Sequence, residues 1–193
     1  MSLNRAMLSS ERPDWETPQE LFDRLNAIFH FQLDAAASAE NKKCDRYFDR
    51  DNSAFDHAWT PGPVWLNPPY RRRRKREPHL PGINDFIDRA QAESERRDVT
   101  VVCLAPARTD TKWFDIIWGY AWLIIFLRGR QKFVGAESGA PFPSAIAIFS
   151  PAPVIERYPN LLATVASIGY AVDPAVLRSS ESPNLELNFS TRS

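Results

Sequence analysis

Val99 to Ala105 is an almost uninterrupted run of apolar residues, and it constrains the fold of this 193-residue chain more than any other feature. A strand that is apolar on both faces is typical of a parallel sheet covered by helices on both sides. Shorter apolar segments and segments of helical periodicity alternate around this run. The further strands that we expect are 31–33, 64–66, 122–127 and 144–149, and the expected helices are 18–30, 84–97, 113–118 and one ending at 168. This alternation predicts a three-layer α/β fold with a mostly parallel sheet, in which ligands bind at the carboxyl ends of the strands.

Length and composition favour a single domain. With 44% hydrophobic and 12% aromatic residues, the chain can bury one sizeable core but is too short to promise two. Residues 1–13 are polar and lack a pattern, so we expect them to be disordered or loosely docked. The expected domain spans 14–170, and 171–193 are expected to form a C-terminal tail.

The helix at 18–30 carries a start signal. Thr17 is a capping residue, Pro18 suits the first helical position, and Glu20 stands where a capping box has its acid. Apolar residues then recur at helical spacing, which predicts a buried stripe. They are Leu21, Phe22, Leu25, Ile28 and Phe29. After the next short strand, 34–38 is expected to be a turn of small residues.

Charge and cysteine content exclude several classes of protein. Lys and Arg together number 24, as do Asp and Glu, so any contact with nucleic acid must be local. Cys44 and Cys103 lack a short spacing and follow no secretory start, which predicts free thiols in a reducing cytosol. The longest apolar stretch, 120–127, is too short to span a bilayer. We therefore expect a soluble cytoplasmic monomer without a membrane partner.

Asn67, Pro68, Pro69 and Tyr70 follow directly after a predicted strand. Neither proline can donate to a strand ladder, so the strand ends here and the backbone direction is restricted. The side-chain oxygen of Asn67 and the carbonyl of Pro68 can accept the two N–H groups of a planar amine such as adenine N6, while Tyr70 stacks on the ring. Holding both N–H groups favours a more tetrahedral nitrogen with a freer lone pair. The motif therefore predicts a catalytic site that activates a planar amine by positioning. The alternative is that the two prolines merely end the strand and that Tyr70 packs on the loop.

Several segments of the chain, taken together with this motif, resemble the phage-type DNA N-6-adenine methyltransferases, the Dam-like family. The resemblance runs from about Asp14 to Phe149 and rests on Asp34-Ala35-Ala36-Ala37-Ser38, Asn41, Cys44, Tyr47-Phe48, Trp59 and Val64 to Tyr70, with further similarity at Glu16 to Pro18, Leu104 to Phe114 and Leu127 to Arg130. It implies a Rossmann-like S-adenosylmethionine-dependent methyltransferase fold for 14–170. It also implies methyl transfer from S-adenosyl-L-methionine to the N6 amino group of an adenine flipped out of double-stranded DNA.

The same resemblance assigns a cofactor site. In that family the motif at Asp34 is the cofactor loop after the first strand, and the motif at Asn67 is the catalytic loop after the fourth. Asp34 would hold the methionine ammonium directly or through water; a buried aspartate that caps a turn is the alternative. Asn67 follows Asp34 by only 33 positions, so we expect an abbreviated connection. The predicted cofactor-binding residues are Thr17, Pro18, Asp34, Ala35, Ala36, Ser38 and Asp51.

Asp51 is the less specific of these assignments. Asp51 or Asp56 would bind the ribose hydroxyls or the adenine amine of the cofactor, but both stand in a stretch rich in acids. A solvated acidic loop is the alternative.

Six consecutive cations follow Tyr70 directly. Such a run is usually solvated or a localisation signal. Next to a predicted catalytic loop, we interpret it as a clamp that contacts phosphates and holds the duplex while a base is flipped. The predicted DNA-binding residues are Arg71, Arg72, Arg73, Arg74, Lys75, Arg76, Arg128 and Arg130.

Two other functions stay open at this point. The same four-residue motif suits methylation of another planar amine or amide, such as a protein glutamine or an RNA base. The loop at Asp34 has alanines where a glycine would allow the closest approach to a ligand, so a DNA-binding module without a cofactor is the second alternative. His57 and His79 have no metal-ligand spacing with the cysteines, and we predict no metal.

Overall fold

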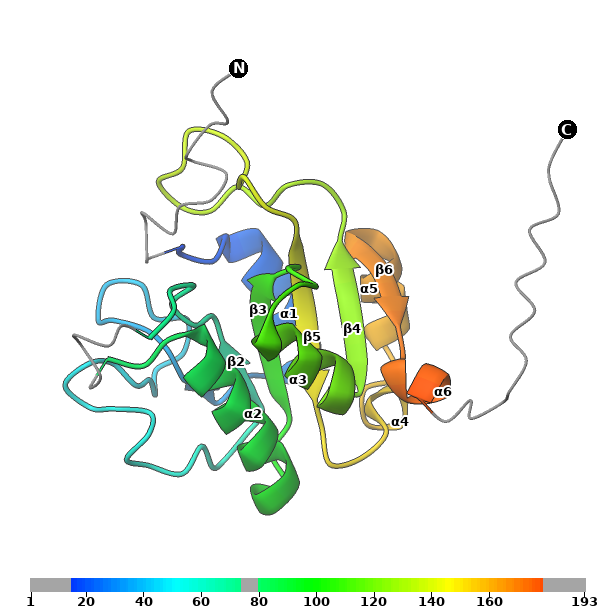
Figure 1. The fold of residues 1–193 in the computed structure, drawn as a ribbon, viewed down its shortest axis with the longest axis horizontal. Helices are drawn as coiled ribbons and strands as arrows, with labels where there is room; N and C mark the ends of the chain where they lie inside the picture. Colours follow the sequence, from blue (N-terminus) through cyan, green and yellow to red (C-terminus); the bar gives the residue numbers. More distant parts are fainter. Residues whose placement is uncertain (1–14, 74–79, 179–193) are drawn as a thin grey trace, which may run out of the picture.

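In the part of the chain that the structure describes, residues 15–73 and 80–178 of a computed structural model, six strands form one sheet (Figure 1). The strands are β1 (Leu33–Asp34), β2 (Val64–Leu66), β3 (Val101–Pro106), β4 (Leu123–Leu127), β5 (Ser144–Phe149) and β6 (Gly169–Val172). Their order across the sheet is β1-β2-β3-β5-β4-β6. The predictions for β2 and β5 are confirmed residue for residue, and the long apolar run forms the fully buried strand β3.

Helices cover both faces of this sheet. They are α1 (Gln19–Phe29), α2 (Ile83–Arg97), α3 (Lys112–Tyr120), α4 (Val154–Arg157), α5 (Leu161–Ile168) and α6 (Pro174–Arg178). In Figure 1, α2 and α3 lie in front of the sheet and α1 and α5 behind it. α2 contacts α3 and β3, whereas α1 contacts α5. The three layers expected from the sequence are therefore present.

The strand directions differ from the prediction, because the sheet is mixed. β1, β2 and β3 run parallel, but β5 is antiparallel to both β3 and β4, and β6 is antiparallel to β4. The chain returns from β4 through 128–143, which contains no helix, and β5 inserts between β3 and β4. Neighbouring antiparallel strands can be joined without a crossover over a face of the sheet, whereas parallel strands cannot. The prediction of a mostly parallel sheet is not confirmed, because an apolar run reports burial on both faces and not strand direction; every residue of β5 is buried too.

α1 buries the predicted stripe but begins differently from the prediction. Its buried residues are Leu21, Phe22, Leu25 and Phe29. Pro18, expected at the first helical position, is instead the N-terminal capping residue, and no side chain caps the first turn. The predicted capping box does not form, because the helix begins one residue later than predicted: the capping residue is Pro18, which has neither a side-chain oxygen nor an N–H, and Glu20 pairs with Arg24 instead (2.6 Å). The helix ends before His30, whose backbone is left-handed with φ 52°.

The connection between β1 and β2 is abbreviated, as the spacing predicted. Residues 35–63, all within the described part, contain no helix and no named strand; Asp34 forms an isolated parallel bridge with Tyr47. Trp59 anchors this loop, since its side chain is fully buried and its backbone N–H donates to the Glu93 carboxylate of α2 (3.0 Å). The loop is thereby attached to the helix that starts beside the second motif.

The chain after β5 builds the outer edge of the sheet. α5 ends at Ile168, as predicted, and β6 follows without having been predicted. β6 pairs with β4, so the sheet contains residues on both sides of the boundary expected at 170. Gly169 permits this pairing, because a Cβ at that position would collide with the carbonyl oxygen of Phe126.

Two further expectations from the sequence concern the state of the two cysteines and the length of the apolar segments relative to a bilayer. Cys44 is half-buried and Cys103 is buried, and both are free, as predicted. Among residues 15–73 and 80–178, no helix combines the length and the apolar character needed to cross a bilayer.

Candidate active site

A cavity of about 630 Å³ opens at the carboxyl ends of the parallel strands β1 and β2. This volume lies in the usual range of pockets for small molecules and cofactors. Its lining residues belong to 15–17 before α1, to the turn 34–43 after β1, to the loop 48–55, to 67–71 after β2 and to 80–86 at the start of α2. The two predicted motifs, which follow different strands, thus meet in one cavity.

Asn67, the first residue after β2, lines this cavity and is held by three hydrogen bonds. Its amide nitrogen donates to the backbone oxygen of Trp15 (2.6 Å) and to the hydroxyl of Thr17 (3.0 Å). Its Oδ1 accepts the phenolic hydroxyl of Tyr70 (2.8 Å). Because the Trp15 carbonyl can only accept, the nitrogen of the amide must face it. The orientation of Asn67 is therefore determined, and its oxygen, with two lone pairs, can accept one further N–H.

Tyr70 supports Asn67 from within the core. Its side chain is 8% exposed, and its ring meets Phe142 edge-on, with 5.7 Å between centroids. The hydroxyl also lies 3.4 Å from the carbonyl of Leu104. Burial raises the pKa of Tyr70 well above its ordinary value, so the phenol keeps its proton and donates. Stacking of Tyr70 on a ligand stays a prediction; the contacts present in the structure direct its hydroxyl to Asn67.

The segment 15–17 is fixed by contacts from two other parts of the chain. The indole of Trp15 packs against Phe133 and Phe142, each at 5.2 Å between centroids. The carbonyl of Glu16 accepts the N–H of Val134 (3.1 Å), and the Glu16 carboxylate pairs with the ammonium of Lys43 (3.3 Å). The loop 128–143 and the turn after β1 therefore hold the residues that orient Asn67.

Asp34 has one of the two roles that the sequence left open, that of a buried cap, and it also lines the cavity. Its carboxylate accepts the backbone N–H groups of Ala36 (3.3 Å) and Lys43 (3.0 Å), so it caps the turn after β1. It also lines the cavity, and it is only 3% exposed. Burial raises the pKa of Asp34 from 3.8 to about 6, against the lowering effect of the two N–H groups and of Lys43. The charged carboxylate is thus poorly stabilised and suits a cationic ligand.

The other predicted cofactor residues divide into two groups. Ala35, Ala36, Ser38, Asp51 and Thr17 line the cavity, whereas Pro18 does not and caps α1 instead. Asp49 also lines the cavity and was missed; its carboxylate accepts the backbone N–H groups of Asp51 (2.9 Å) and Asn52 (2.8 Å). Asp56, the other predicted acid, is not among the lining residues.

Of the basic residues after Tyr70 that the structure describes, the first lies at the cavity and the next two lie on the surface. Arg71 lines the cavity, whereas Arg72 and Arg73 are exposed, with Arg73 3.3 Å from the Asp85 carboxylate. Gly82 makes room for this segment, because a Cβ there would lie 2.6 Å from the carbonyl oxygen of Arg71. The remaining members of the run, Arg74, Lys75 and Arg76, lie outside the described residues.

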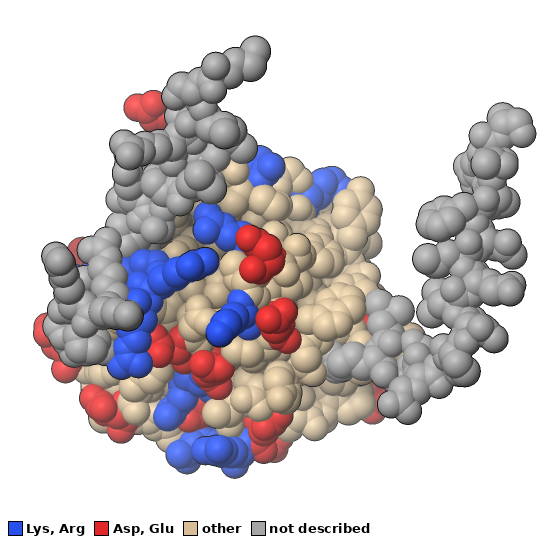
Figure 2. Space-filling view, in the orientation of Figure 1, with Lys and Arg blue, Asp and Glu red and all other residues tan. Residues whose placement is uncertain are grey.

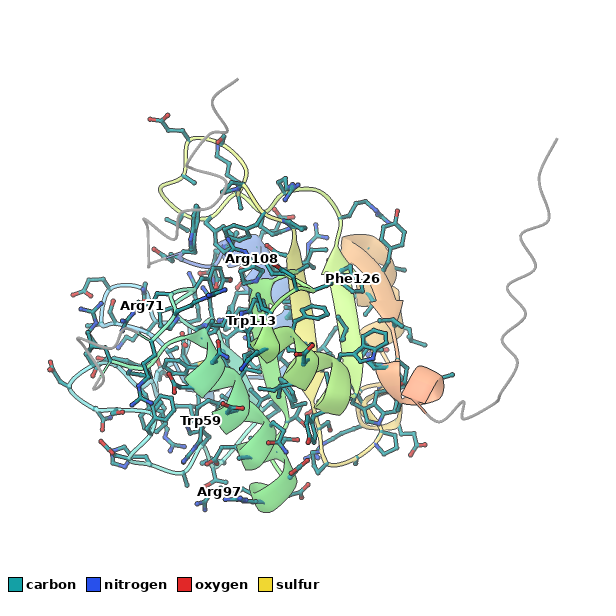
Figure 3. All side chains as sticks on the ribbon, in the orientation of Figure 1. Trp59, Arg71, Arg97, Arg108, Trp113 and Phe126 are labelled. Atoms are coloured by element: carbon teal, nitrogen blue, oxygen red, sulfur yellow. The ribbon has the colours of Figure 1, made fainter. Side chains whose placement is uncertain are left out.

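Further cations follow the neighbouring strands. Arg128 and Arg130 are exposed directly after β4, and Arg128 lies over the ring of Tyr170 (5.1 Å). Arg108, which was not predicted, follows β3 and lies over the ring of Phe142 (5.7 Å). Figure 3 labels it above Trp113 and to the upper right of Arg71. Figure 2 shows basic side chains in the upper, middle and lower parts of this face, interspersed with acidic ones. The mixture of the two signs on this face agrees with the net charge of zero.

Comparison with known proteins identifies the family. A family model described as DNA N-6-adenine-methyltransferase (Dam) matches residues 5–149. The chain belongs to this family. The match includes both motifs of the cavity, the segment 15–17 and the loop 128–143 that holds it.

Two phage relatives support the assignment to the Dam family. The DNA N-6-adenine-methyltransferase of Escherichia phage T1 is 32% identical over 142 residues, which cover 65% of this chain and 55% of that protein. That of Haemophilus phage HP1 (strain HP1c1) is 28% identical over 150 residues, covering 74% of this chain and 81% of that protein. This Dam-family chain therefore spans about half the length of the phage T1 relative and most of the HP1 relative.

Within the Dam-family site, sequence reasoning missed the residues that hold the motifs in place. Trp15, Lys43 and Phe133 are the clearest cases. Trp15 carried one usable signal, an aromatic residue next to the predicted Glu16-Thr17-Pro18 segment. No local pattern marks Phe133, since it stands in a loop without periodicity.

Proposed function

We propose that this chain transfers a methyl group from S-adenosyl-L-methionine to the N6 amino group of an adenine flipped out of double-stranded DNA. The observation that carries the proposal is the oriented amide of Asn67, a residue that lines the same cavity as the buried Asp34. A Rossmann-like methyltransferase fold is part of the proposal, because β1, β2 and β3 run parallel and the cavity opens where they end. Family membership supports both parts.

The residues present fit the proposed methyl donor. Its methionine ammonium is a cation, and the buried carboxylate of Asp34 would hold it, directly or through water. The small residues Ala35 and Ala36 leave space beside that carboxylate. At another part of the wall, Phe55 and Phe86 supply apolar rings and Asp51 an acid for the adenosine end. S-adenosyl-L-methionine would supply an electrophilic methyl group.

The chain's own residues act on the amine that receives this group. Asn67 Oδ1 and the Pro68 carbonyl accept the two N–H groups of adenine N6, which favours a tetrahedral nitrogen and frees its lone pair. The proton leaves to solvent only after the methyl group has arrived, so a neutral amide suffices and no strong base is needed. Positioning by preorganised acceptors is then the main contribution of the protein.

Methyl transfer by the purified chain tests this proposal. We expect N6-methyladenine in digests of a duplex incubated with S-adenosyl-L-methionine, measured by mass spectrometry. The same assay with RNA and with protein substrates tests the other planar amines and amides that suit the motif. If calorimetry detects no binding of the methyl donor and no substrate is methylated, the alternative of a DNA-binding module without a cofactor replaces the proposal.

Replacing Arg71, Arg72 and Arg73 with serine tests the proposed contact with DNA. Each phosphate contact contributes about 0.9 to the slope of log affinity against log salt, so the slope should decrease by roughly two to three if these arginines reach phosphates. Fluorescence anisotropy of a labelled duplex at several salt concentrations measures the affinity and therefore this slope.

Arg96→Ser is the matched control for the arginine variant. Arg96 is exposed near the far end of α2, which at 15 residues is about 22 Å long; Figure 3 labels its neighbour Arg97 at the lower end of the molecule. This control should leave the slope at the parental value. A triple variant with an unchanged slope would mean that Arg71 to Arg73 are solvated and do not clamp the duplex.

A further inference from the structure

Thr17 lines the cavity, and its hydroxyl contacts Asn67. Its side chain is 2% exposed, and its hydroxyl accepts a hydrogen bond from Asn67 Nδ2 (3.0 Å), although 50 positions separate the two residues. The second N–H of the same amide donates to the backbone of Trp15. The two groups that accept hydrogen bonds from the Asn67 amide nitrogen thus both belong to the segment before α1.

We infer that Thr17 is a positioning residue that sets the orientation of the Asn67 amide. The inference rests on the proposed function, in which Asn67 Oδ1 accepts an N–H of the target adenine. It replaces the cofactor-binding role that the resemblance implied for Thr17. It also gives the hydroxyl a purpose that capping of α1 does not, since no side chain caps that helix.

Two physical effects connect Thr17 with the acceptor strength of Asn67. If the Asn67 amide were rotated by half a turn, Oδ1 would face the Trp15 carbonyl and the Thr17 oxygen. This orientation is unfavourable, because the Trp15 carbonyl oxygen and Oδ1 are both acceptors and repel each other. Donation from the amide nitrogen to two acceptors also polarises the amide and makes its oxygen a stronger acceptor. Loss of the Thr17 hydroxyl weakens both effects and leaves one buried N–H without its partner.

Thr17 is itself held rigidly enough for this role. On its N-terminal side, Glu16 is tied to Lys43 and to the backbone of Val134. On its C-terminal side, the carbonyl of Pro18 accepts the N–H of Phe22 in the first turn of α1 (3.2 Å). The hydroxyl is therefore anchored on both sides and cannot easily follow a displaced amide.

The experiment compares Thr17→Val, Thr17→Ser and Thr100→Val. Valine keeps the shape of threonine without the hydroxyl, and serine keeps the hydroxyl. Thr100 is a matched control, because it is also 2% exposed, its hydroxyl meets another hydroxyl (Ser150, 3.4 Å), and it precedes β3 at the end opposite the cavity. We expect Thr17→Val to lower kcat on the order of tenfold with the KM for S-adenosyl-L-methionine within about twofold of the parent. Thr17→Ser should retain most of the rate, and Thr100→Val all of it.

A second readout does not depend on activity. The side-chain NH₂ of Asn67 should exchange slowly with solvent in the parent chain, as measured by NMR, and faster in Thr17→Val. Rapid exchange in the parent, or a Thr17→Val variant that loses affinity for the methyl donor with an unchanged kcat, would overturn the inference. A parent chain that methylates nothing would overturn the proposed function instead, while the NH₂ signals would still report on Thr17.

Discussion

Asn67→Ala is expected to lower the rate of methyl transfer at least a hundredfold, with the fold and the affinity for S-adenosyl-L-methionine almost unchanged. The variant removes one of two acceptors that hold the target amine, and loss of one preorganised polar contact typically costs a factor of about 10² to 10³ in kcat. The rate loss should appear in kcat and in kcat/KM equally, because the contact matters most in the transition state. Single-turnover methylation and calorimetric titration measure the two properties separately.

The Asn67→Asp variant tests in addition whether the hydrogen bond from Asn67 to the Trp15 carbonyl is needed. Aspartate has the size of asparagine, but a carboxylate cannot donate to the Trp15 carbonyl, which lies 2.6 Å from Asn67 Nδ2. We therefore expect the aspartate variant to be impaired as well, with partial recovery at low pH, where a protonated carboxyl can donate. Asn160→Ala, an exposed site at the start of α5, is the control and should retain the parental rate. Parental activity in Asn67→Ala would remove Asn67 from the catalytic site.

Local composition was enough to predict most elements of the fold. β2 has sharp limits in the sequence because three apolar residues are followed at once by Asn67 and two prolines that cannot continue a ladder. α1 was recognisable from the spacing of its apolar residues. Strand direction was not predictable in this way, since the parallel β3 and the antiparallel β5 are both six residues long and buried throughout. Direction follows from the connections, and the loop 128–143, whose length was predicted, carries no signal of its course.

The candidate site was predictable only where its residues follow strands. Asp34 and Asn67 each follow an apolar segment, and the rule that ligands bind at the carboxyl ends of parallel strands was enough to bring them together. Thr17 was named for capping and for the cofactor, but its contact with Asn67 depends on the path of the whole intervening chain. The packing of Trp15 on Phe133 is likewise a tertiary contact, which spacing alone cannot reveal.

Asp34→Asn is expected to weaken binding of S-adenosyl-L-methionine about tenfold to a hundredfold, the usual effect of losing a hydrogen bond to a charged group. Asparagine keeps the size of the side chain and one acceptor for the turn, but it removes the charge. The pH dependence separates the two roles further. Because the pKa of Asp34 is raised to about 6, the parent should lose affinity about tenfold for each pH unit below 6 and level off above it. The α-ammonium of the ligand, with an ordinary pKa of about 7.7 to 8.0, stays protonated below about pH 7, so the slope below pH 6 would belong to Asp34.

The same raised pKa affects the stability of the ligand-free chain. Between the ordinary value of 3.8 and about 6, the folded form binds the proton of Asp34 more tightly than the unfolded form. The free energy of unfolding should therefore decrease as the pH rises through this window, by on the order of 3 kcal/mol from this group. Asp34→Asn lacks this titration, so its stability should depend less on pH, and saturating ligand should stabilise the parent more than the variant above pH 6.

Calorimetric titrations between pH 5 and 8, with urea unfolding at the same pH values, test both parts of the Asp34 prediction. Asp115→Asn, an exposed site on α3, is the control and should show the parental affinity and the parental pH dependence. An Asp34→Asn variant that is less stable but keeps the parental affinity at every pH would show that the carboxylate only caps the turn through Ala36 and Lys43. A variant that binds the ligand more weakly above pH 6, and whose affinity does not change with pH below 6, would show that the charge of Asp34 interacts with the ligand. Capping of the turn requires an acceptor but not a charge.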